Sequence, residues 1–115
     1  IASAGLTETQ AREQGYEVKV STLPMEYVPR ALAARDTRGL IKLVVDETTD
    51  LLLGAHVLAP EGSEIIQTAV MAIRFGLTVS QLRKTMFPYL TNVEGLKLAV
   101  LGLEKDVAML SCCAG

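Results

Sequence analysis

The sequence predicts an α+β fold, an antiparallel β-sheet with helices packed on one side. The segment 40–45 is apolar apart from Lys42 and rich in β-branched residues, and 51–58 is also largely apolar. The polar stretch 46–50 between them has the length of a hairpin turn. After Pro60 the apolar residues recur instead at helical spacing. Strand-like segments therefore come first and helical segments follow, which is typical of this class.

The first thirty residues contain one helix signal and one strand signal. Thr7 followed by Gln10 is a capping-box pattern, which predicts a short helix over 8–14 that ends at Gly15. Residues 16–20 alternate apolar and polar side chains, as a half-buried strand does.

The middle of the chain changes character twice. Pro24 and Pro29 bracket a segment that we expect to be irregular, followed by a helical turn over 31–34. The apolar residues of 65–73 then follow a helical period, and Gly76 is a natural end for that helix.

Two further helices are predicted near the C-terminus. One covers 79–84, with Thr78 or Ser80 as its cap, and the other begins near Asn92. The apolar positions that define the second are Val93, Leu96, Val100, Leu103 and Val107. Leu98 is also apolar but lies on another face, so we expect this helix to have surface left over for another subunit.

Composition limits the classes of function. The 115 residues suffice for one domain, and the net charge of −2 with scattered basic residues argues against nucleic acid or an anionic membrane as partner. No apolar stretch approaches the roughly 20 residues of a spanning helix. The chain begins at Ile1 rather than Met, so we expect it to be a fragment of a longer protein, and its cysteine usage indicates the cytoplasm.

The two cysteines of the chain, Cys112 and Cys113, are adjacent. Neighbouring Cα atoms lie about 3.8 Å apart, whereas a relaxed disulfide needs roughly 4.4–6.8 Å. The pair is therefore a poor structural crosslink and suits a soft metal ion or thiol exchange. The alternative is two incidental thiols at a chain end. His56, the single histidine, is expected to be a packed, hydrogen-bonded residue rather than a metal ligand.

Several segments resemble one family. Four of them resemble the C-terminal dimerisation domain of the flavin-dependent pyridine nucleotide–disulfide oxidoreductases: residues 1–8, 38–43, 53–56 and 62–66. Within it, the segments that resemble the mercuric reductase branch are Phe87-Pro88-Tyr89-Leu90-Thr91 and Leu110-Ser111-Cys112-Cys113-Ala114-Gly115.

The resemblance implies a homodimeric enzyme that uses NADPH and FAD, bound mostly by an N-terminal part, to reduce Hg(II) to Hg(0). It implies a dimerisation domain over 1–108 and a flexible tail over 109–115, in which Cys112 and Cys113 bind Hg(II) and pass it to the partner subunit's redox cysteines. Tyr89 would position Hg(II) beside those cysteines. The isolated chain would be inactive because it lacks the flavin.

One position departs from the wider family, which has a His-Pro-Thr sequence here, with the histidine and a following glutamate as acid–base pair. Phe87 stands in place of the histidine, and Glu94 matches the glutamate only loosely. Two alternatives to metal delivery stay open: a purely structural dimerisation module, and a dithiol electron relay. The missing histidine counts against the relay, because the leaving thiolate would lack its acid.

Overall fold

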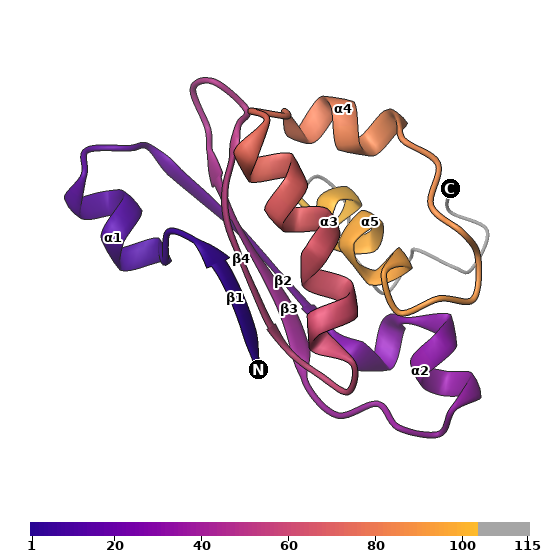
Figure 1. The fold of residues 1–115 in the computed structure, drawn as a ribbon. Coiled ribbons are helices and arrows are strands. Elements are labelled where there is room, and N and C mark those ends of the chain that lie inside the picture. Colours follow the sequence, from indigo (N-terminus) through magenta and orange to yellow (C-terminus); the bar gives the residue numbers. More distant parts are fainter. Residues whose placement is uncertain (104–115) are drawn as a thin grey trace.

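The computed structural model describes residues 1–103 and confirms the α+β class. Its elements, in chain order, are β1 (Ala2–Gly5), α1 (Glu8–Glu13), β2 (Val18–Pro24), the 3-10 helix η1 (Met25–Tyr27), α2 (Pro29–Ala33), β3 (Leu40–Asp46), β4 (Leu52–Leu58), α3 (Gly62–Arg74), α4 (Val79–Lys84) and α5 (Glu94–Leu101). The four strands form one antiparallel sheet in the order β1-β4-β3-β2 (Figure 1).

The predicted hairpin lies at the centre of the sheet. Strands β3 and β4 pair antiparallel, with a register shift between Val44 and Val45. Strand β2 pairs with β3 and differs from the prediction, because it begins at Val18 and continues to Pro24. Pro24 has no N–H to donate, which a strand tolerates at the edge of a sheet, and β2 is such an edge strand.

Strand β1 was not predicted from the sequence. It pairs with β4 through Ala2↔Val57 to Gly5↔Gly54 and forms the other edge of the sheet. Its residues, Ala-Ser-Ala-Gly, are small and show no strong apolar alternation. The strand exists because β4 offers it a partner, and a distant partner of this kind is not visible in local sequence.

The helix ends follow local signals closely. Thr7 and Gln10 form both hydrogen bonds of a capping box at the start of α1, and Thr78 and Gln81 do the same for α4. Helix α3 begins at Gly62, earlier than its apolar stripe alone indicated, and the chain leaves it through Gly76, whose φ of 64° is left-handed.

The helices divide unequally between the two faces of the sheet. Figure 1 shows α3, α4 and α5 on one side and α1 on the opposite side. On the α1 side, Ala11 packs with Val18 and Val44 in a small second cluster. The expectation of helices on one side thus holds for the main core, with α1 as a short cover on the other face.

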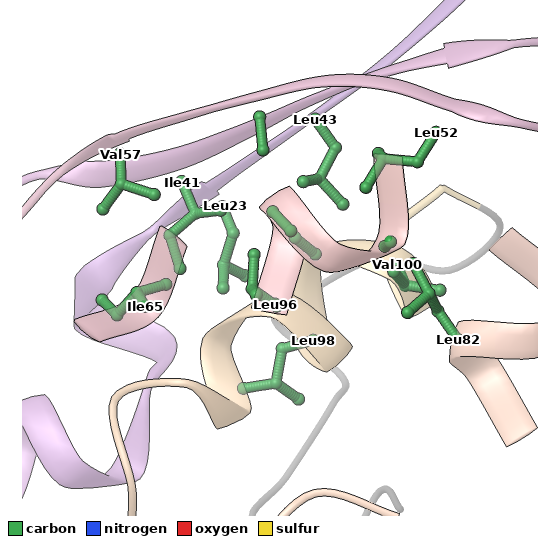
Figure 2. Close-up of a cluster of buried hydrophobic side chains, with 14 of the residues drawn as sticks. Leu23, Ile41, Leu43, Leu52, Val57, Ile65, Leu82, Leu96, Leu98 and Val100 are labelled. Atoms are coloured by element: carbon green, nitrogen blue, oxygen red, sulfur yellow. The ribbon is translucent and has the colours of Figure 1, made fainter. Parts of the chain in front are cut away.

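The main core lies between the sheet and the helices α3 and α5. Figure 2 shows Leu23, Ile41 and Leu43 projecting from the strands toward these helices. At Gly95 the approach is so close that a Cβ atom would lie 2.6 Å from Ile41 Cδ1. Helix α5 can therefore pack directly against the strands because glycine occupies this position.

The extra apolar face of α5 differs from the expectation. Leu98 and Ala99 are buried within the chain, with 3% and 0% exposure. Helix α5 contacts β2, β3, α3 and α4. Leu98 and Ala99 are therefore not left for another subunit, whereas Leu101 is half-buried. Val107, predicted to continue the helix, lies outside the described residues. None of the helices within 1–103 is both long enough and apolar enough to cross a bilayer.

Candidate functional site: the Tyr89 loop

Residues 85–93 connect α4 to α5 and are called the Tyr89 loop (Figure 1). Its side chains divide unequally between the core and the solvent, with residues 88–90 all exposed. Phe87 packs against the main core, while Met86, Tyr89 and Leu90 are 91%, 58% and 43% exposed. The loop therefore presents Tyr89 at the surface while Phe87 anchors it.

By the resemblance described above, Phe87 is expected to stand where the wider family carries a histidine. It lines a small apolar cavity of about 10 Å³ together with Leu82, Leu96 and Val100. A cavity of this size is at the limit for one water molecule and offers it no polar partner. A phenylalanine ring in this environment serves packing and supplies no proton for acid–base chemistry.

Leu90, the residue after Tyr89, has a left-handed backbone with φ of 64°. This conformation costs a residue with a side chain about 1–2 kcal/mol. The Leu90 N–H donates to Glu94 Oε1 at 3.2 Å. This hydrogen bond is exposed to water, so it contributes about 0.5–1.5 kcal/mol. The two ranges overlap, so the Glu94 carboxylate offsets much of the cost of the turn.

Further contacts fix the rest of the Tyr89 loop to α5. Thr91 Oγ1 donates to the Pro88 carbonyl at 2.8 Å and accepts from the Glu94 N–H at 3.3 Å. At the other end, Lys97 Nζ donates to the Thr85 carbonyl at 3.1 Å. The first turns of α5 thus hold the loop at both of its ends.

The Tyr89 loop also contacts the turn that precedes α3. Asn92 Nδ2 donates to Glu61 Oε2 at 3.0 Å, and Glu61 is itself left-handed, with φ of 58°. The contact joins two segments 31 positions apart in the sequence. Neither this pair nor the Glu94–Leu90 pair was identified from the sequence, in which the visible signal was only an acidic residue at the start of a predicted helix.

The predicted metal ligands fall outside the part of the chain that can be described. Cys112 and Cys113, with the tail 109–115, lie beyond residue 103. Their nearness to Tyr89 therefore stays a prediction. Within 1–103, no three residues of the types His, Cys, Asp and Glu gather closely enough to hold a metal ion.

His56 lies on the sheet face that carries α1 and is hydrogen-bonded as expected. Its Nε2 is 3.0 Å from the Leu6 carbonyl oxygen, so the Nε2–H tautomer donates there. Its cross-strand neighbour Lys42 donates to Glu8 at 3.0 Å, and Glu8 also pairs with Arg12. The hydrogen bond from Lys42, followed by that from Arg12, holds the pKa of Glu8 below its ordinary value. These contacts attach α1 to the sheet.

Comparison with known proteins connects this arrangement to one family. The family model described as the pyridine nucleotide-disulphide oxidoreductase dimerisation domain matches residues 1–100. Mercuric reductases from Bacillus cereus and Staphylococcus aureus are 60% and 52% identical over all 115 residues of the chain. The chain spans 18% and 21% of the lengths of these two relatives, so it corresponds to about a fifth of such a protein.

Solved structures agree with the fold. The HOCl-induced flavoprotein disulfide reductase RclA from Escherichia coli superposes with a TM-score of 0.81 at 38% identity, covering 86% of this chain and 23% of that one. An NAD-dependent persulfide reductase from A. fulgidus superposes with a TM-score of 0.66 at 25% identity, covering 87% of this chain and 20% of that one. Because the family model covers most of the sequence, the chain belongs to the pyridine nucleotide–disulfide oxidoreductase dimerisation-domain family.

Proposed function

We propose that this chain is the C-terminal dimerisation part of an NADPH-dependent flavoprotein mercuric reductase, a cytoplasmic homodimer that reduces Hg(II) to Hg(0). The observation that carries the proposal is identity of 51–60% to three mercuric reductases over the entire chain, including the segment with Tyr89 and the adjacent cysteines. The exposure of Tyr89 at 58% supports a role in contact with something outside the domain.

The chemistry proposed for the cysteines is ligand exchange. Residues 1–108 would form the dimerisation domain, and 109–115 a tail whose Cys112 and Cys113 thiolates bind Hg(II), a soft cation that prefers sulfur. Each Hg–S bond to the tail is then replaced by one to a redox cysteine of the partner subunit. Both thiols lose a proton on binding the metal and regain one on releasing it, and no electrons move during the handover.

Tyr89 would act at the receiving end of this exchange. Its exposed side chain would lie beside the partner subunit's redox cysteines and orient the incoming Hg(II). Phe87, packed into the core, supplies no proton there. Exchange of a metal between thiolates needs less proton transfer than disulfide exchange does, so an apolar residue at this position fits a metal substrate.

The cofactors would be bound mainly outside this chain. The sequence has no Gly-x-Gly-x-x-Gly segment to approach a dinucleotide phosphate, and its glycines instead serve turns and close packing. Bound in the complete enzyme, FAD would supply the redox chemistry by which two electrons of NADPH reduce the metal. The chain alone would therefore hold Hg(II) without reducing it.

The test is a Cys112→Ala, Cys113→Ala double variant of the full-length enzyme, with Ser111→Ala as the matched control that keeps both thiols. We expect turnover to fall when Hg(II) is supplied as a complex with a bulky thiol, while flavin reduction by NADPH is unchanged. Turnover equal to that of the control would refute the delivery role.

A dithiol electron relay is the competing function, favoured by the resemblance to a flavoprotein disulfide reductase. Relay activity would require a proton for the leaving thiolate, and Phe87 cannot donate one. Assaying one preparation for both disulfide and Hg(II) reduction separates the two. A purely structural dimerisation module predicts that the double cysteine variant keeps full Hg(II) turnover.

A further inference from the structure

Glu94 has a role in this structure that its loose match to the family's glutamate does not explain. It is the first residue of α5, and its Oε1 accepts the Leu90 N–H at 3.2 Å. Its backbone N–H points to Thr91 Oγ1 at 3.3 Å. Its hydrogen-bond partners are therefore groups of the Tyr89 loop, and the family's histidine is replaced by Phe87.

We propose that Glu94 is a positioning residue for Tyr89: by holding the Leu90 N–H, its carboxylate sets the direction in which the tyrosine projects toward thiolate-bound Hg(II). The inference takes its substrate, thiol-bound Hg(II), from the proposed function. Its positioning mechanism is argued from the geometry of the loop. Glu94 acts through the backbone and contacts neither substrate nor cofactor.

The backbone geometry explains why one hydrogen bond matters here. Leu90 has φ of 64°, whereas the ordinary helical value is about −63°. Relaxation to that value would rotate the chain by about 127° around the N–Cα bond of Leu90. Tyr89 would then point in a different direction even if the rest of the loop stayed in place.

The other described contacts of the loop are made at positions other than the Leu90 N–H. Phe87 fixes the chain two residues before Tyr89 by packing into the core, and Lys97 fixes Thr85 further back. Thr91 Oγ1 bonds the Pro88 carbonyl and closes the loop around the tyrosine. Of the contacts described for 1–103, the one to the peptide that joins Tyr89 to Leu90 comes from the Glu94 side chain.

The chemistry of the side chain separates positioning from acid–base work. Glutamine keeps an Oε1 that can accept from the Leu90 N–H, but it cannot exchange a proton as a carboxylate does. Alanine removes the acceptor. A positioning role thus predicts that Glu94→Gln resembles the parent enzyme and Glu94→Ala does not, while an acid–base role predicts equal damage from both.

The experiment uses the full-length enzyme with Glu94→Gln, Glu94→Ala and Tyr89→Phe. Amide hydrogen exchange is followed in peptides that span 86–95, together with kcat/KM for thiol-bound Hg(II) and with flavin reduction by NADPH. Loss of one hydrogen bond should make the Leu90 amide of Glu94→Ala exchange about three- to tenfold faster. Its kcat/KM should fall as far as that of Tyr89→Phe, with flavin reduction unchanged and Glu94→Gln near the parent in all three measurements.

The two kinds of failure give different results. Unchanged exchange in Glu94→Ala, or equal losses in Glu94→Gln and Glu94→Ala, would overturn the positioning role. Faster exchange but normal turnover in Glu94→Ala, with Tyr89→Phe impaired, would also overturn the positioning role. That result would leave the proposed function intact. Normal turnover in Tyr89→Phe would remove the proposed role of the tyrosine and this inference with it.

Discussion

Replacing Phe87 with alanine should destabilise the domain, because the ring is the point at which the Tyr89 loop enters the core. Phe87 packs against the main hydrophobic cluster and lines the small apolar cavity beside Leu82 and Leu96. Truncation would enlarge a cavity that has no polar group to hold water. It would also release the loop from its core contact.

The magnitude follows from how deeply the ring is buried. A fully buried Phe→Ala change costs about 3–5 kcal/mol. Phe87 is only partly buried, so we expect about half of that, roughly 2 kcal/mol. For a chain of this length, a loss of this size lowers the melting temperature by about 8 °C.

The chain's other phenylalanine provides a matched control. Phe75 is 64% exposed and lies 5.8 Å from the Arg74 guanidinium, so Phe75→Ala removes the same atoms at a loss of about 0.5 kcal/mol. Urea unfolding of the 115-residue chain, followed by circular dichroism, measures both variants. Equal free energies of unfolding for the two variants would refute the assignment of Phe87 as the core anchor.

Two further predictions concern the β1–α1 corner. Gly54→Ala would place a Cβ 1.9 Å from the Leu6 carbonyl oxygen, so the backbones must separate, and we expect a loss of about 3 kcal/mol or more in urea unfolding; a loss under 1 kcal/mol would contradict the close approach. Because Lys42 lowers the pKa of Glu8 in the folded state, the stabilisation is present above the usual value of 4.5 and is lost as pH falls through the lower folded value. The difference in melting temperature between the parent and Glu8→Gln should therefore shrink below pH 4.5, and a constant difference down to pH 2 would argue against it.

The parts of the fold that local sequence encodes were predicted correctly. The capping box of Thr7 and Gln10 was predicted because both partners are visible in one short segment. For α4 the sequence left Thr78 or Ser80 open as the cap, and the structure shows Thr78 in a capping box with Gln81. Strand β1 was missed because its stability comes from pairing with β4, about fifty residues away. The burial of Leu98 was missed for a similar reason, since the elements that cover α5 come from four different parts of the chain.

The candidate site was predictable only in part. The role predicted for Tyr89 came from resemblance, and the structure adds that its side chain is exposed. The contact between Glu94 and Leu90 depends on a left-handed φ at a leucine, a conformation that no sequence rule assigns to this residue. The inward position of Phe87 depends on the packing of α4 and α5 around it, which local sequence does not specify.

The replacement of histidine by phenylalanine that the resemblance implies would change what this loop needs from its neighbours. A loop that carries a proton donor must hold an imidazole in reach of a sulfur atom, and a glutamate beside it serves that purpose. A loop that hands on a metal by thiolate exchange needs a fixed direction for its tyrosine instead. Phe87 anchors the loop by packing into the core. Glu94 holds the turn at Leu90 by accepting its N–H. The Glu94 carboxylate would then hold the backbone instead of transferring a proton. The proposed handover of Hg(II) depends on the conformation of the peptide between Tyr89 and Leu90.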